Sequence, residues 1–243
     1  MMRSGNPALQ ESTFRQVAAA YGEDRMTLQG TVNKTGLSVL IVAACAAVTW
    51  NMENPSLLML LGVFGGLGVG LLTAFKKTVA PYTTPIYAAL EGLFLGGVSR
   101  MYEVKFKGIV IMAVGLTLGV LAALLAVYTS RLIKVTENFR LGVVAATGGI
   151  AIFYLISMVL GFFGIRIPYI HESGIIGIGF SLFVVTIAAL NLVLDFDFIE
   201  RGAAHGAPKF MEWYAAFGLL VTLVWLYLEI LRLLAKIMGK SRN

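Results

Sequence analysis

Four acidic side chains stand inside or at the edge of long apolar stretches, where charge is otherwise rare. They are Glu91 in PIYAALEGLFLGGVSR, Asp195 and Asp197 in LNLVLDFDFIERG, and Glu212, which follows Lys209. A carboxylate at the centre of a bilayer costs about 2.5 to 3.5 kcal/mol on insertion scales, so such groups face a bundle interior or a wet cavity. The chemistry open to them is the binding of a proton or a cation.

Glu91 is the most conspicuous of these acids because of its depth. It lies ten residues after Pro81 and nine before Arg100, which places it near the middle of its apolar stretch. It is a candidate for ion or proton sensing. The alternative is a neutral glutamic acid that is hydrogen-bonded to a neighbouring helix.

Asp195 and Asp197 are two residues apart, and on a helix such residues point about 200° away from each other. At most one of them can therefore face the core. We expect Asp195 to face the bundle interior and to sense an ion or a proton. Asp197 is a weaker candidate for the same role, and the alternative is an interfacial charge that partners Arg201.

Glu212 opens the last apolar run, and the short loop before it makes the last two helices neighbours. Asp195 and Glu212 could therefore lie close together. Two nearby carboxylates in a low dielectric share a proton or recruit a cation, so such a pair would sense pH or cations. The alternative for Glu212 is stabilisation of a helix N-terminus by an anion.

The elements that must position these acids are seven continuous apolar runs. They are residues 35–52, 56–75, 82–102, 108–128, 141–164, 173–198 and 211–235. A membrane-spanning helix needs about 20 apolar residues, and the runs lack the alternation of a barrel strand. The sequence predicts an all-α, polytopic membrane protein with an extramembrane segment at 1–34, a seven-helix transmembrane domain at 35–237 and a tail at 238–243.

Composition supports this fold class over a soluble protein. Apolar residues make up 58% and charged residues 13% of the chain, and the mean hydropathy is +0.83. A soluble domain carries roughly twice that charge. The net charge of +6 does not predict nucleic-acid binding, because the lysines and arginines are scattered between the apolar runs.

Loop charge predicts the orientation. With the N-terminus in the cytoplasm, eleven lysines and arginines lie on the cytoplasmic side and eight on the other. The positive-inside rule therefore favours a cytoplasmic N-terminus.

Small and polar residues within the runs predict helix contacts. Three glycine pairs have the small-xxx-small spacing that permits close helix packing, namely Gly66 with Gly70, Gly92 with Gly96, and Gly115 with Gly119. Near the far end of the last run, Glu229 and Arg232 are spaced to pair on one helix face as an interface anchor, with Lys236 one turn beyond.

We expect no enzymatic activity, resident cofactor or metal site. The run around Ser181 lacks the second glycine of a serine elbow, and no GxGD element marks a pair of catalytic aspartates. His171 and His205 lie in loops without metal-site spacing. Calcium or protons would then be bound only as a transported or sensed ion.

Three stretches, PIYAALEGLFLGG, VTENFRLGVVAATGGIAIFY and LVLDFDFIERGA, resemble the Bax inhibitor-1 and YccA-like superfamily, also called the transmembrane Bax inhibitor motif family. The N-terminal RSGNPALQESTF and MTLQGTVNKTG resemble a bacterial branch of it. The resemblance runs from about residue 3 to residue 237. It implies six helices around a central seventh, in the inner membrane of a bacterium.

The resemblance also implies a pH-sensitive calcium leak governed by two aspartates on the last two spans. Asp195 matches the first of them, whereas Thr222 stands at the position of its partner. Glu91 matches an acidic position in the third helix, and Glu91 with Asp195 is a second candidate couple. Glu212 is ten residues from Thr222, about 15 Å along a helix, so a pair using Glu212 would lie closer to the cytoplasm.

The leading functional hypothesis is a pH-responsive cation (calcium) channel or transporter that uses membrane-embedded carboxylates. The alternative is a non-conducting regulatory protein that binds another membrane protein, such as a membrane protease, through its glycine-rich faces and N-terminal segment. The bilayer is the expected environment in both cases. The oligomeric state stays open.

Overall fold

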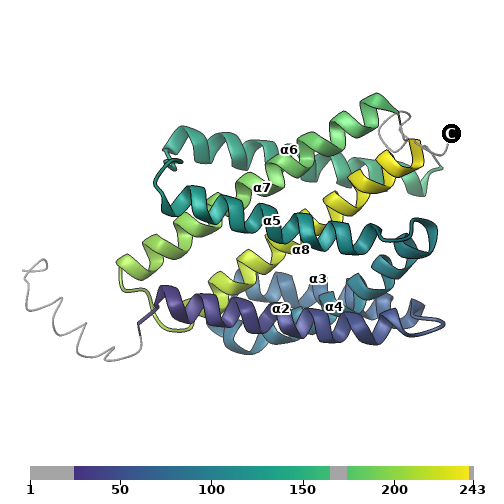
Figure 1. The fold of residues 1–243 in the computed structure, drawn as a ribbon. Helices are drawn as coiled ribbons and strands as arrows, with labels where there is room; N and C mark the ends of the chain where they lie inside the picture. The colour runs from purple at the N-terminus through teal and green to yellow at the C-terminus, as the bar shows by residue number, and fades with distance from the viewer. Residues whose placement is uncertain (1–24, 165–173, 241–243) are drawn as a thin grey trace, which may run out of the picture.

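Seven long helices make up most of the structure, a computed structural model that describes residues 25–164 and 174–240. They are α2 (Leu28–Trp50), α3 (Ser56–Phe75), α4 (Ala80–Lys105), α5 (Ile109–Thr129), α6 (Glu137–Phe162), α7 (Ile175–Ala204) and α8 (Met211–Lys240), with a 3-10 turn η2 (Lys77–Val79) before α4. The all-helical fold predicted from the sequence is confirmed. The start of α2 marks what we term the N-terminal end of the bundle, and the end of α8 marks the C-terminal end (Figure 1).

Six of these helices are long and apolar enough to cross a membrane, and α4 is the exception. Its 26 residues span about 39 Å, which is ample for a bilayer. It is more polar because protein, rather than lipid, surrounds much of it. It packs against α2, α3 and α8 and buries Thr83, Thr84 and Ser99. The chain is therefore a multi-pass integral membrane protein.

Helix α2 begins earlier than its apolar run, inside the segment 1–34 that was expected to lie outside the membrane. Thr27 caps the helix by accepting a hydrogen bond from the Gly30 N–H at 2.9 Å, and Gln29 donates to Asn33 at 2.8 Å. Capping and side-chain bonding thus extend the helix into polar sequence. Residues 1–24, 165–173 and 241–243 lie outside the described residues.

Helix α8 lies at the centre of the bundle. It packs against α2, α4, α5 and α7, and it supplies residues to both larger core clusters, including Leu226 to one and Leu220 to the other. The edge of Tyr87 on α4 meets the ring of Phe217 on α8 with centroids 4.9 Å apart. The expected arrangement around a central helix is thus present, with α3 against α4 and α6 against α7 in outer positions.

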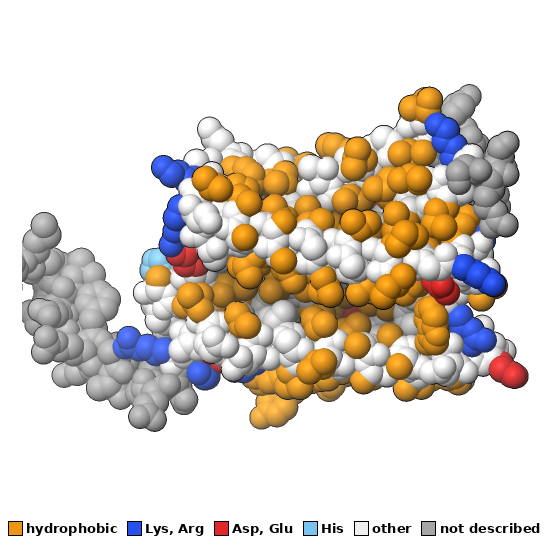
Figure 2. Space-filling model, in the orientation of Figure 1, with side chains coloured by type: hydrophobic (Ala, Val, Ile, Leu, Met, Phe, Trp, Pro, Cys, Tyr) orange, Lys and Arg blue, Asp and Glu red, His pale blue; other side chains and the backbone are white. Residues whose placement is uncertain are grey.

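The outer surface is apolar along the helices and charged at their ends. Large side chains such as Leu57, Phe75 and Phe162 are 78%, 87% and 82% exposed. Figure 2 shows hydrophobic side chains along the middle of the molecule, and lysine, arginine, aspartate and glutamate at the two ends. This distribution fits a bilayer, whose hydrocarbon core covers the middle while the headgroup regions meet the ends.

Glycines bring α4 close to α2 and to α3. A Cβ added at Gly92 would lie 2.5 Å from the Val42 carbonyl oxygen of α2, and one added at Gly96 would meet Ala46 of the same helix. On the other side, Gly66 of α3 faces Glu91. The contacts bind α2, α3 and α4 into one layer, because each requires the absence of a side chain.

Gly70 of α3 lies at the same interface, with Tyr87 and Phe217 within 4 Å of an added Cβ. Gly115 and Gly119 differ, since no heavy atom within the described residues lies within 4 Å of a Cβ at either position. That third glycine pair, on α5, therefore does not mark a contact with another helix among the described residues.

We predict that Gly92→Ala destabilises the protein by about 1 to 3 kcal/mol, the usual cost of overpacking. The new methyl group would clash with a backbone carbonyl of α2, which cannot move without shifting the helix. The measurement is the thermal unfolding midpoint in detergent. Gly119→Ala is the matched control and should leave the midpoint unchanged or raise it slightly, because alanine favours a helix. Equal effects of the two substitutions would contradict the prediction.

Candidate functional site

Asp195 lies on α7, where this helix packs against α8. It is nine residues before the end of α7 at Ala204, about 14 Å along the axis. On α7 itself, Leu192 and Phe196 beside it are 0% and 7% exposed. The carboxyl group thus lies beside buried apolar side chains, two residues before Asp197, where the charged end of α7 begins.

The Asp195 carboxyl has few partners. The side chain of Thr222 on α8 approaches it, and the Thr222 hydroxyl donates to the Gly218 carbonyl at 3.3 Å. The Asp195 Oδ2 atom is enclosed and has no hydrogen-bond partner in the described residues. No lysine or arginine of the described chain pairs with it, so this carboxyl lacks a compensating charge.

Thr222 is therefore where the family resemblance placed it, facing Asp195 from the neighbouring helix. A hydroxyl group stands at the position where the resemblance implied a second carboxylate. A hydroxyl can donate a hydrogen bond to an ionised carboxylate and accept one from a protonated carboxyl group. The interface can thus accommodate either state of Asp195, with one titratable group in place of two.

Glu91 lies near the middle of α4 and faces α3. Its Oε1 atom would be 3.3 Å from a Cβ at Gly66, so the glycine leaves room for the carboxyl group. Tyr87, one turn earlier on α4, lies close to Glu91 and packs on Phe217 of α8. The polar neighbour of Glu91 is thus on its own helix, whereas the alternative interpretation expected a hydrogen bond to a neighbouring helix.

Among the acids of the described residues, Glu212 has the largest number of polar partners. Its side chain is 0% exposed and is paired with Lys34 of α2 and, at 3.0 Å, with Lys209. Thr27 donates to Glu212 Oε1 from both its backbone N–H and its hydroxyl group, each at 2.8 Å. The carboxylate therefore ties the start of α2 to the start of α8.

A short strap of residues 25–27 holds Thr27 in place. The Met26 N–H donates to the Ala207 carbonyl at 2.7 Å, and Arg25 forms an isolated bridge with Pro208. Met26 is 3% exposed and belongs to the largest core cluster. Sequence reasoning missed this strap, because its polar residues gave no periodic signal.

Asp197 points away from the core, as expected, and is held by two arginines. Arg201 donates to it at 2.9 Å from one turn later on α7, and Arg140 of α6 donates at 3.0 Å. The predicted partnership with Arg201 is present, and Arg140 was not anticipated. Asp197 therefore links α6 to α7 at the N-terminal end.

Glu200 forms a second such link. It accepts a hydrogen bond from Tyr128 at 2.5 Å and is paired with Arg131, just beyond α5. Hydrogen bonding to Glu200 raises the pKa of the Arg131 guanidinium above its usual range. The pair thus stays ionised and joins α5 to α7.

The C-terminal end of α8 carries a buried charged group. Glu229 is 1% exposed and pairs with Arg232 at 2.8 Å, as the spacing predicted. Tyr154 of α6 completes the group by donating to Glu229 at 3.0 Å and accepting from Arg232 at 2.6 Å. The group anchors the outer helix α6 to the central helix.

Lys236, which sequence reasoning placed simply one turn further out, is instead buried at 6% exposure. Its ammonium group donates to the Gly177 carbonyl at 2.9 Å and to the Ser181 hydroxyl at 2.8 Å. In both bonds the lysine is the donor, so α7 acts as its acceptor surface.

The described residues do not bring the predicted acids together. Neither Glu212 nor Glu91 contacts Asp195. Glu212 is paired with lysines, and Glu91 lies beside a tyrosine of its own helix. In the described residues no group of three or more His, Cys, Asp or Glu side chains could hold a metal ion. His205 bonds the Arg201 carbonyl at 2.7 Å, and His171 lies outside the described residues.

Comparison with known proteins identifies a family. Residues 6–239 match the family model described as Bax inhibitor 1 like. Searches of curated proteins and of solved structures found no significant match. The match covers all seven helices, and so covers both Asp195 and Thr222.

We predict that Glu212→Gln lowers stability by about 1 to 3 kcal/mol, the range for buried groups that lose their partners. The loss should be smaller than that of a fully buried ion pair, because Lys209 is 44% exposed. Thermal unfolding in detergent measures it. Glu137→Gln is the control, because Glu137 is 74% exposed, and its effect should stay below about 0.5 kcal/mol. An unchanged midpoint for Glu212→Gln would show that the strap does not depend on this carboxylate.

Proposed function

The chain belongs to the Bax inhibitor 1 like family, and from this premise and the geometry at Asp195 we propose that it is a pH-responsive cation leak channel or transporter with calcium as the ion. The observation that supports the proposal is the enclosed Asp195 carboxyl without a compensating charge. A bare carboxylate in such a place is costly. Binding a proton or a cation removes that cost.

The other acids are less suited to this role. Glu212 and Asp197 are neutralised by lysines and arginines, and their function is to hold the bundle ends. Glu91 has the Tyr87 hydroxyl group close by, which makes it a secondary site on the opposite face of the central helix. Asp195 thus carries the proposal, and Glu91 is the second group to test.

The small number of oxygen ligands favours a leak over tight binding. Calcium takes six to eight oxygen ligands, whereas Asp195 and Thr222 together offer three side-chain oxygens. Water would complete the shell, and the ion would leave easily, as conduction requires. The single carboxyl group also implies that one proton controls the site, so the pH profile should follow a simple one-site titration.

We expect calcium flux into liposomes containing the protein, with a rate that changes between about pH 5 and 8. Asp195→Asn resembles the protonated state, so its flux should match that of the wild-type protein at acidic pH and lose its pH dependence. The measurement uses a calcium-sensitive dye inside the vesicles. Glu137→Gln, an exposed acid at the same end of the bundle, should retain the wild-type profile.

Two results would contradict this proposal. One is the absence of calcium flux at every pH in this range with correctly folded protein. The other is flux whose pH profile is the same in Asp195→Asn. The regulatory role, without conduction, would then be the remaining hypothesis, and copurification with a membrane protease would test it.

We also propose that the protein lies in a bacterial inner membrane with its N-terminal end in the cytoplasm. In a Cys45→Ala background, Lys107→Cys at the C-terminal end should react with a membrane-impermeant thiol reagent in spheroplasts. Lys134→Cys at the N-terminal end should react only after permeabilisation. The reverse pattern would show the opposite orientation.

A further inference from the structure

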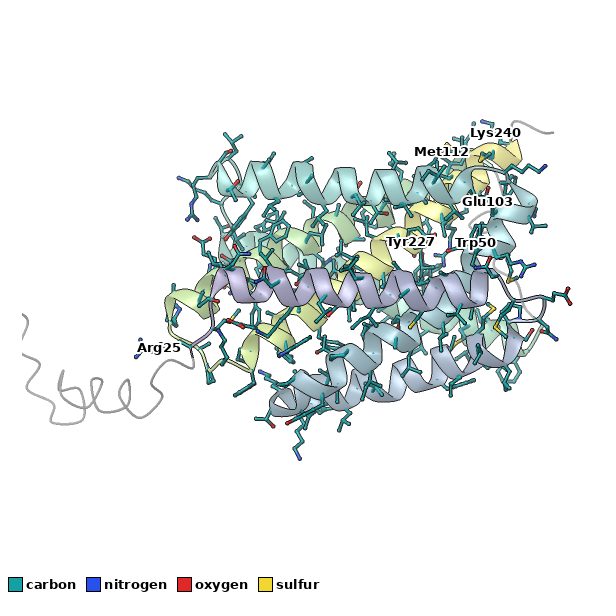
Figure 3. All side chains as sticks on the ribbon, turned by 60° about the horizontal axis from the view of Figure 1, so that its bottom comes forward. Arg25, Trp50, Glu103, Met112, Tyr227 and Lys240 are labelled. Carbon is teal, nitrogen blue, oxygen red and sulfur yellow. The ribbon has the colours of Figure 1, made fainter. Side chains whose placement is uncertain are left out.

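A pocket opens at the C-terminal end of the bundle, remote from Asp195, where the end of α2 meets the end of α4. Its volume is about 500 Å³, and its lining residues are Trp50, Asn51, Arg100, Glu103, Val104 and Lys107. Figure 3 shows Trp50 and Glu103 near each other at this end, with Arg25 at the opposite end. The cation leak proposed above makes no use of this pocket.

Arg100 lacks an acceptor in this pocket. Its Nη1 atom is enclosed and has no hydrogen-bond partner in the described residues, and no ion pair joins Arg100 to any of them. An enclosed donor without an acceptor is expensive, and more so when it is charged. The planar guanidinium group matches the oxygens of a phosphate or a carboxylate. Arg100 therefore points to an anionic ligand.

Two further donors in the lining are also without partners. In the part of the chain that the structure describes, neither the Lys107 ammonium group nor the Trp50 indole N–H has an acceptor. Trp50, Arg100 and Lys107 thus supply to one pocket three donor side chains for which no described residue is the acceptor, and Arg100 Nη1 is the enclosed one. The set is selective for an acceptor-rich group such as a phosphate.

The one carboxylate in the lining is already engaged. Glu103 accepts hydrogen bonds from the backbone N–H groups of Gly108 at 2.5 Å and Val110 at 3.1 Å, one at each oxygen. It therefore stabilises the start of α5 and is not paired with Arg100. Two cations against one carboxylate leave the lining with one excess positive charge.

The flank of the pocket is apolar and lies at the depth of the lipid headgroups. Val104 and Met101 of α4 are 77% and 66% exposed, and tryptophan is enriched at membrane interfaces. An amphiphilic ligand could place its phosphate in the pocket and its acyl chains along α4. Basic pockets between membrane helices bind lipid headgroups in this way.

We propose that Trp50, Arg100 and Lys107 bind the phosphate of an anionic phospholipid that carries one net negative charge, such as phosphatidylglycerol. One negative charge matches the excess positive charge of the lining. A zwitterionic lipid would add an ammonium or choline cation to a pocket that is already positive, and should bind more weakly. The site is independent of calcium conduction.

The test uses the full chain in a neutral detergent and titrates phosphatidylglycerol while the thermal unfolding midpoint is followed. For the wild-type protein we expect a saturable rise in the midpoint that phosphatidylcholine does not reproduce. Arg100→Gln should weaken the apparent affinity about tenfold or more, and Lys107→Ala should weaken it severalfold. Lys134→Ala, an exposed loop lysine at the opposite end, is the matched control and should titrate as the wild type does.

Native mass spectrometry provides a second readout, since it counts the lipids retained by each variant. If Arg100→Gln does not fold, the lipid titrations of Lys107→Ala and Trp50→Phe test the proposal. Trp50→Phe keeps an aromatic ring but removes the indole N–H donor. Equal stabilisation by phosphatidylcholine, or unchanged titrations in the variants, would overturn the proposal. An equal rise with inorganic phosphate or glycerol phosphate alone would show a site for a free anion and would also overturn the lipid assignment.

Discussion

The Glu212 carboxylate is fully enclosed, and it stays ionised there only because two lysines and Thr27 surround it. Its partners come from the strap before α2, from α2 itself and from the loop before α8. Once these bonds form, the entry point of α8 is fixed, and α8 is the helix on which most of the others pack. The buried Glu229 and Lys236 fix its other end. The middle of α8 needs no polar contacts of this strength, because Leu220, Leu226 and their neighbours fill it.

Asp195 contrasts with this pattern along the same interface. Glu212 has three hydrogen bonds and a further ion pair with Lys209, whereas Asp195 has one hydroxyl neighbour and an oxygen atom without a partner. The buried acids at the ends of the bundle thus have partners of opposite charge, while the interface between α7 and α8 retains an uncompensated group. Membrane proteins keep such groups at a cost in stability, and they commonly mark ion or proton sites.

Most of the fold followed from the apolar runs, because seven continuous runs of membrane length leave few alternatives to a helical bundle. The early start of α2 did not follow, since it depends on Thr27 and on Glu212, which are 185 positions apart in the sequence. Helical geometry predicted that Asp195 and Asp197 point to different sides of α7, but it did not by itself say which of them faces the core. The partners of the acids were not, because Arg140, Tyr154 and Lys34 approach them from other helices, and helical spacing says nothing about contacts between helices.

The depth of Asp195 has an electrical consequence. It lies two residues, about 3 Å along the axis, inside Asp197 at the charged end of α7, so a proton or cation that reaches it from the water crosses a small part of the transmembrane voltage. A full crossing is worth about 2.3 kcal/mol per 100 mV for one charge. The occupancy of Asp195 would thus depend on the membrane potential as well as on pH and ion concentration. An energised cell and one with a collapsed potential would then fill this site to different extents, even in identical solutions.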